Sequence, residues 1–277
     1  MTAFVNNMKT VMLLGALFGL LVWAGWALGG AQGLIVAGIF ALVMNFGAWF
    51  FSDRIAIAAM RGKEVDERSA PDLYVMVQRL AQRASLPMPR VYICPHEAPN
   101  AFATGRNPKH SAVAVTVGAL RLLNHEELEG VMAHELAHIK NRDTLTATIA
   151  ATVAGIFSML AYGAFLFGGS GRQGGHPLAL LGVVVLGALG AALIKAMISR
   201  SREFVADADG AKIAGSPNGL ASALRKLDSY ARRIPMQNPN PAMNNLFIVE
   251  PFMGQALTNM FATHPPTERR IAALMRG

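Results

Sequence analysis

Four stretches of this 277-residue chain contain no Asp, Glu, Lys or Arg, and they constrain the fold more than any other feature. They span residues 11–28, 33–51, 146–167 and 177–194, so each has 18 to 22 residues. Because a helix rises about 1.5 Å per residue, each is long enough to cross a hydrocarbon core of about 30 Å. Helices of a soluble core usually keep a polar stripe, which these stretches lack. They therefore predict four transmembrane helices.

The rest of the chain has the composition of an ordinary soluble domain. It holds all 25 basic and 17 acidic residues, and the overall hydrophobic fraction of 53% excludes a disordered chain. An uncharged link at 29–32 joins the first two stretches and predicts a transmembrane hairpin over 1–53. The second pair predicts another hairpin over 146–198. The polar segments 54–145 and 199–277 are then the two parts of one domain.

Basic residues predict the orientation of the hairpins. They flank the outer ends, whereas the two inner links carry only Arg172. The positive-inside rule then places both termini and the polar domain in the cytoplasm. Topology and contact with anionic lipid explain the net charge of +8, because no basic run with interleaved aromatics indicates nucleic acid binding. The flanking residues are Lys9, Arg54, Arg61, Lys63, Lys195, Arg200 and Arg202.

The polar domain is predicted to be mainly α-helical, with a small β-sheet. Asn124, followed three residues later by Glu127, is typical of a helix that begins with a capping box. The single cysteine, Cys94, excludes an internal disulfide and a multi-thiolate zinc site. Helices are predicted over 66–83, from 125 past 138, over 199–214 and over 217–233, strands over 90–94, 101–104 and 112–117, and a loop over 234–252.

The sequence His134-Glu135-Leu136-Ala137-His138 carries the clearest chemical signal. Residues four apart lie on one face of a helix, so the two imidazoles can bind one zinc ion. The glutamate beside the first histidine can then reach a metal-bound water and act as general base. Chance matches to this pattern are rare in a chain with seven histidines. The pattern predicts metal-assisted peptide hydrolysis.

A catalytic zinc ion needs a third protein ligand and one open position. Asn141 stands where the extended pattern with a third histidine requires glycine, so that solution is excluded. Glu203 is the first glutamate after His138, and Asp207 lies one helical turn further on. We predict that Glu203 binds the metal and Asp207 orients a ligand histidine; alone, the two acids would read as a pair of surface carboxylates. The two predicted spans between His138 and Glu203 return the chain to the same side of the membrane. His264 and Arg270 are candidates to stabilise the oxyanion.

Several motifs occur together in the order found in one known family. They are Pro-Asn-Ala-Phe-Ala-Thr-Gly at 99–105, Ala-His-Glu-Leu-Ala-His at 133–138, Asn-Arg-Asp at 141–143, Arg-Glu-Phe-Val-Ala-Asp at 202–207 and Thr-His-Pro-Pro at 263–266, with Glu268 and Arg270. In these motifs and in the four spans the sequence resembles the HtpX branch of peptidase family M48. These are membrane-embedded zinc metalloproteases related to the CAAX prenyl proteases.

The resemblance implies a zincin-like cytosolic metalloprotease domain that holds one zinc ion per subunit. It implies His134, His138 and Glu203 as zinc ligands, Glu135 as catalytic base and Asp207 as the residue that orients His134.

It also implies that the segment Asn100-Ala101-Phe102 is an edge strand that pairs with the substrate backbone, and that His264 and Arg270 contact substrate. Main-chain pairing suits a protease of low sequence specificity. Bacterial members act in the inner membrane on misfolded or damaged membrane proteins, so such proteins, unfolded polypeptides and the lipid bilayer are the expected partners. The sequence does not indicate an oligomeric state.

Three other functions compete with this prediction. A non-catalytic, zinc-stabilised membrane scaffold would not need Glu135. A four-span transporter would need polar groups within the spans, which offer few apart from Asn45. A CAAX-type processing protease shares the family's chemistry and stays open as an alternative.

Overall fold

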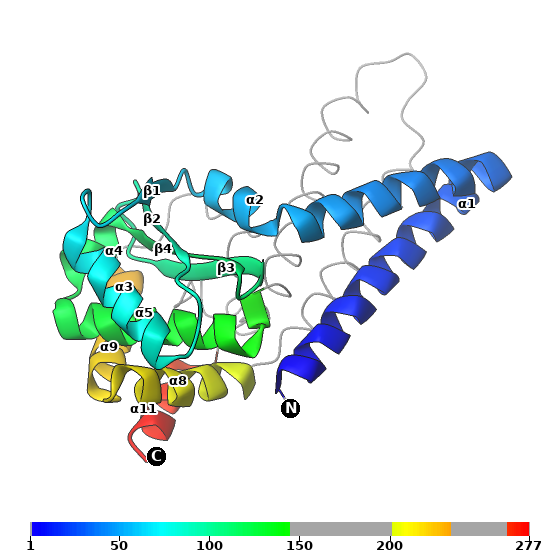
Figure 1. Cartoon of the computed structure of the whole chain (residues 1–277). Helices are drawn as coiled ribbons and strands as arrows, with labels where there is room; N and C mark the ends of the chain where they lie inside the picture. The colour runs from blue at the N-terminus through cyan, green and yellow to red at the C-terminus, as the bar shows by residue number, and fades with distance from the viewer. Residues whose placement is uncertain (1, 145–200, 234–264, 277) are drawn as a thin grey trace.

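The structure is a computed structural model that describes residues 2–144, 201–233 and 265–276 (Figure 1). The described part is mainly helical, with one small mixed sheet, as predicted. The third and fourth predicted spans, the predicted loop at 234–252 and His264 lie outside the described residues.

The N-terminal helix α1 (Thr2–Phe50) doubles back on itself. Gly30 has a φ of +56°, a left-handed conformation that glycine adopts readily, and it lies in the predicted link at 29–32. The two arms then meet, because the side-chain amide of Asn45 donates to the carbonyl of Leu14 at 3.0 Å. Within residues 2–144, 201–233 and 265–276 one window, Gly30–Gly47, is long and apolar enough to cross a membrane, and only 6% of it is buried. The membrane crossing of both arms stays a prediction.

A four-stranded sheet follows helix α2 (Ser52–Ala59) in the chain. The sheet order is β1-β2-β4-β3, with β2 and β4 parallel and the other pairs antiparallel. This order leaves β3 at the edge of the sheet. The strands are β1 (Lys63–Val65), β2 (Arg90–Cys94), β3 (Ala101–Asn107) and β4 (His110–Thr116).

Alternating side chains cover the two faces of the sheet. Val113 and Val115 of β4 belong to the main core, whereas Ala112 and Ala114 pack in a second core with Phe102 and residues of α2. This alternation follows from the two-residue period of a strand. The predicted strand at 101–104 extends to Asn107, because β3 and β4 form a hairpin that pairs Asn107 with His110. The predicted end at residue 117 shortens to Thr116, whose side chain caps helix α4 (Val117–Leu122).

Five further helices lie within the described residues of the domain. Helix α5 (His125–Asn141) lies at its centre, between β3 on one side and α8 (Ser201–Ala214) and α9 (Asn218–Arg233) on the other. Helix α11 (Thr267–Leu274) packs on α8 and α9 (Figure 1). Helix α3 (Pro71–Arg83) begins later than predicted, because Asp66 forms a turn by accepting from the backbone N–H groups of Arg68 and Ser69.

Candidate metal centre

Helix α5 places the two predicted histidines side by side. The capping box that fixes its first turn is present, because Asn124 accepts from the Glu127 backbone and Glu127 accepts from the Asn124 backbone, each at 2.9 Å. One turn apart on the buried face, His134 and His138 approach to 3.1 Å between their Nε2 atoms. At this separation the lone pairs of the two Nε2 atoms can be shared by one metal ion.

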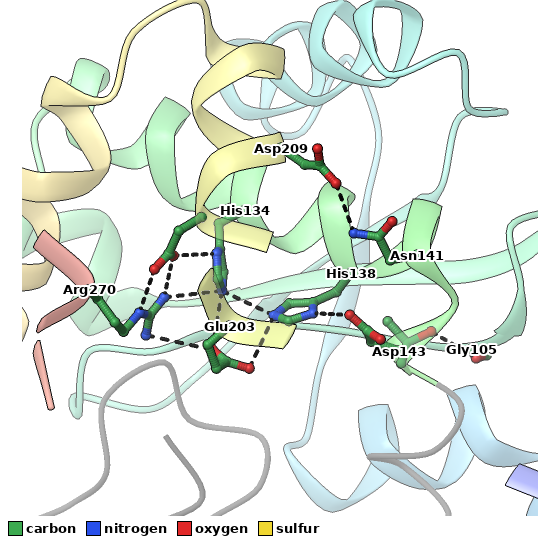
Figure 2. A network of polar contacts seen from close by, with 10 residues as sticks. Gly105, His134, His138, Asn141, Asp143, Glu203, Asp209 and Arg270 are labelled. Atoms are coloured by element: carbon green, nitrogen blue, oxygen red, sulfur yellow. Dashed lines mark hydrogen bonds and ion pairs between the residues drawn. The ribbon is translucent and has the colours of Figure 1, made fainter. Parts of the chain in front are cut away.

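Helix α8 brings Glu203 to the same point (Figure 2). Its carboxylate oxygens lie 3.8 Å from His134 Nε2 and 3.7 Å from His138 Nε2. One donor atom from each residue lies within 4.8 Å of the others. The structure thus brings together the three side chains that the sequence singled out, although 64 residues separate His138 from Glu203.

Two carboxylates lie behind the histidine rings. Asp207 Oδ1 is 3.0 Å from His134 Nδ1, on the ring edge opposite the candidate site, and its orienting role stays a prediction. Asp143 Oδ2 is likewise 3.0 Å from His138 Nδ1. Asp143 ends the Asn-Arg-Asp motif at 141–143, and its place beside His138 was not predicted from the sequence. The chain turns back after Asn141, since Arg142 has a left-handed φ of 59°, and this turn returns Asp143 to His138.

Arg270 of α11 is buried beneath the same group (Figure 2). Its Nε and Nη2 donate to the two oxygens of Asp207 at 2.9 and 2.7 Å, a bidentate pair. Its Nη1 lies 3.7 Å from Glu203 Oε2, and Nη2 lies 3.4 Å from His134 Nε2. With 1% of its side chain exposed, Arg270 faces the candidate ligands, and its contact with substrate stays a prediction.

Glu135 is buried beside the same cluster, between α5 and the sheet. It is 5% exposed, and the backbone of Ala103 on β3 lies close enough to its carboxylate to favour the ionised form. The predicted substrate segment forms the start of this edge strand: the Asn100 backbone bonds to Thr116, while Ala101 and Phe102 pair with Val115 and Ala114 of β4.

Burial and charge shift the pKa values within the cluster. Burial raises the pKa of Glu135, and the negative charge of Glu203 raises it further, against the opposing effects of the histidines and of the Ala103 N–H. Burial alone would raise the pKa of Asp207 too, but the hydrogen bonds and positive charges of Arg270 and His134 outweigh it and lower this pKa to about 2. Burial disfavours charged His138, but Glu203 and Asp143 outweigh this and raise its pKa to about 9.

The residues present fit a zinc ion. Two imidazole nitrogens and a carboxylate oxygen are a donor set that zinc accepts in catalytic sites, with bonds of about 2.0–2.2 Å. The carboxylates behind the Nδ1 atoms leave the two Nε2 atoms to face the metal position. His264 lies outside the described residues.

Comparison with known proteins assigns the family. The model of peptidase family M48 matches residues 67–276. Proteins named Protease HtpX homolog are 52% identical over 276 residues in Desulfatibacillum aliphaticivorans, covering 97% of this chain and 89% of that one. In Burkholderia cenocepacia the identity is 50% over 274 residues, covering 98% and 96%.

The fold also resembles a solved structure. The crystal structure of S. mikatae Ste24p aligns with a TM-score of 0.53 and 16% identity, covering 98% of this chain and 66% of that one. At this identity the likeness concerns the fold alone. Family model and relatives together show that the chain belongs to peptidase family M48 and, like its HtpX homologues, is a membrane metalloprotease.

Proposed function

We propose that this protein is a zinc-dependent endopeptidase of the bacterial inner membrane that cleaves misfolded or damaged membrane proteins on the cytoplasmic side. The observation that carries the proposal is the convergence of His134, His138 and Glu203 within 4.8 Å, next to the buried Glu135. Three protein ligands with a neighbouring carboxylate are the composition of a hydrolytic rather than a structural zinc site.

Each residue of the cluster has a proposed task. His134, His138 and Glu203 hold the zinc ion, which when bound acts as a Lewis acid on a peptide carbonyl and acidifies water. Glu135 takes a proton from the attacking water and later delivers it to the leaving amine. Its raised pKa suits a group that must both accept and release a proton near neutral pH.

The carboxylates and Arg270 have a positioning task. Asp207 and Asp143 hold the imidazole rings by their Nδ1 atoms, so the Nε2 atoms keep their direction. Arg270 fixes Asp207 and lies within 3.7 Å of Glu203, which offsets part of the negative charge.

The substrate is proposed to bind as an added strand along β3. Among the described strands β3 has a neighbour on one side only, β4. The backbone of Ala103 in this strand lies beside Glu135, so a peptide paired with the segment 100–102 would pass close to the base. Main-chain pairing recognises extended polypeptide of many sequences, which suits a quality-control protease.

Glu135→Gln tests the hydrolytic proposal. The full chain in detergent is compared with this variant for zinc content, by mass spectrometry, and for casein cleavage. We expect the variant to keep one zinc ion and to lose cleavage by a factor of about 10² to 10⁴, the contribution typical of a general base. Glu126→Gln is a matched control, because Glu126 is an exposed glutamate of the same helix. Equal cleavage by wild type and Glu135→Gln would refute the proposal.

A second comparison separates the proposal from its alternatives. Glu203→Gln should lower zinc occupancy as well as cleavage, and full occupancy would show that another residue is the third ligand. A scaffold would bind zinc and cleave neither casein nor a membrane protein. Cleavage restricted to prenylated C-terminal peptides would instead identify a CAAX-type processing enzyme.

A further inference from the structure

The C-terminal end of α1 carries a cluster of aromatic rings that the catalytic chemistry does not use. Phe50 stacks on Phe46 at a centroid distance of 5.6 Å and meets Phe51 edge-on at 5.0 Å, and Trp49 lies 6.0 Å from Phe46. All four rings are at least 36% exposed. The cluster begins at the end of the Gly30–Gly47 window, where a helix that crosses a bilayer would reach the headgroups.

Two arginines bracket this aromatic cluster from different parts of the chain. Arg54 of α2 lies over the Phe51 ring at 5.9 Å. Arg106, near the end of β3, lies over the Phe50 ring at 4.4 Å and donates to the Phe50 carbonyl at 2.7 Å. A guanidinium has five N–H donors in a planar fork, so one backbone acceptor leaves Arg106 with donors for a phosphate.

The surroundings of these arginines are basic. Within residues 44–62 and 101–116 the sequence has one acid, Asp53, which is buried and paired with Arg90. The turn between β3 and β4 adds Lys109 and His110, which are both exposed. An aromatic cluster with a basic rim matches the headgroup layer of an anionic bilayer.

The end of β3 is hydrogen-bonded to the end of the second predicted span and to the segment just before the third. Arg106 bonds to Phe50, at the end of the second span, while the carbonyl of Gly105 accepts from the hydroxyl of Thr144, two residues before the third. Figure 1 shows this end of β3 beside the junction of α1 and α2. Two adjacent residues of the strand are therefore tied to the membrane-proximal chain on both sides.

We propose that Arg54 and Arg106, with the aromatic cluster at Trp49–Phe51, form a binding site for the phosphate of anionic phospholipids in the bilayer. The site holds the Gly105–Arg106 end of β3 in the headgroup layer. Ala103, whose backbone lies beside Glu135, is three residues from Arg106, a span of about 10 Å along a strand. The strand that passes beside the catalytic base therefore ends at the headgroup layer, within reach of a segment that has just left the bilayer.

Depth is tested on the full chain in nanodiscs. Lys109→Cys and Lys212→Cys are a matched pair, because both lysines are exposed and only Lys109 is near the proposed site. The native Cys94 is buried and should not react with a bimane label. We expect a nitroxide on lipid headgroups to quench the label at 109 strongly and the label at 212 weakly. The proposal would be overturned if the lipid nitroxide quenched the labels at 109 and 212 equally and iodide dissolved in the water also quenched both labels equally.

Lipid preference is tested by native mass spectrometry on protein released from nanodiscs of phosphatidylcholine and phosphatidylglycerol. Arg54→Gln and Arg106→Gln should each lower the retained ratio of phosphatidylglycerol to phosphatidylcholine by about fivefold. This is the effect expected when one basic residue no longer attracts the anionic headgroup. Arg68→Gln, an exposed arginine of the β1–α3 loop, should leave the ratio unchanged.

Two outcomes would count against the site. An unchanged ratio of the two lipids in both arginine variants would overturn it. If Arg106→Gln fails to fold, Arg54→Gln keeps the test valid, because within the described residues the Arg54 side chain makes no hydrogen bond to the backbone, unlike Arg106. Millimolar inorganic phosphate that shifts the bimane emission in detergent as much as phosphatidylglycerol does would show a soluble anion as the ligand. Neither readout requires proteolysis, so the lipid site and the proposed function can fail separately.

Discussion

Gly210 sets how closely α8 approaches the first candidate ligand on α5. A Cβ atom at this position would lie 2.9 Å from His134 Cα and 3.0 Å from His134 N, where ordinary contacts need about 3.4–4 Å. The obstructing atoms are backbone atoms, so no side-chain rotation relieves the clash. In Gly210→Ala the two helices must therefore separate by roughly 0.5–1 Å.

The two effects of Gly210→Ala on stability oppose each other. Alanine favours a helix over glycine by about 1 kcal/mol, whereas overpacking costs about 1–3 kcal/mol. The net change in the free energy of unfolding is therefore about 0–2 kcal/mol of destabilisation. The metal site should respond more strongly, because Glu203 lies on α8 and ligand distances tolerate only about ±0.2 Å. We expect zinc affinity to fall by about 10- to 100-fold, the range seen when ligand support is lost.

The assay is competition for zinc between a fluorescent chelator and the metal-free full chain in detergent. Ala208→Gly is the matched control, because Ala208 is exposed on the same helix. It should cost about 1 kcal/mol of stability through helix propensity and leave zinc affinity unchanged. If Gly210→Ala binds zinc as tightly as wild type, the reasoning that this close approach places Glu203 is refuted.

Three further predictions concern the support around the site. Glu127→Gln should destabilise the fold by about 1.5–3 kcal/mol in urea unfolding, because the buried carboxylate accepts from Ser222 and Lys226 of α9, each at 2.7 Å. Apparent zinc affinity should fall about tenfold per pH unit below about pH 9 in chelator titrations, because the metal displaces one proton from His138. Asp143→Asn should weaken zinc binding by about 10- to 100-fold, and an unchanged affinity would remove its orienting role.

The sequence predicted the parts of the site that depend on local periodicity. His134 and His138 share a helix face because they are four residues apart, and the capping box at Asn124 fixed where that helix begins. Asp143 was missed because its place depends on the left-handed turn at Arg142, and arginine does not signal such a turn.

Other features depend on packing between distant segments. Gly210 carries no local signal of its role, because the close approach of α8 to α5 exists only in the tertiary fold. The edge position of β3 follows from the strand order, in which β4 inserts between β2 and β3, and alternation within a strand carries no information on its neighbours. The burial of Arg270 could not be read from one arginine in a short C-terminal helix; its bidentate pairing with Asp207 requires the tertiary fold.

The charge of the metal-free site leads to a last prediction, on Glu135. The candidate metal site contains four buried carboxylates, and Arg270 offsets only part of their negative charge. They belong to Glu135, Asp143, Glu203 and Asp207. Burial first, and then the nearby Glu203, raises the pKa of Glu135 above its unfolded value. A carboxylate with a raised pKa destabilises the fold when it is ionised. This loss of stability is fully present above the pKa of the folded state, and it disappears as the pH falls below the pKa of the unfolded state.

Glu135→Gln should therefore stabilise the metal-free protein at pH 8, and this gain should vanish by about pH 4, near the unfolded pKa. Urea unfolding of chelator-treated wild type and variant at both pH values measures it, with exposed Glu126→Gln as the control. Zinc should shrink the gain as well, because a divalent cation offsets the charge that the glutamate adds. A variant no more stable than wild type at pH 8 would show that the fold bears no cost for keeping Glu135 ionised, which would refute the prediction.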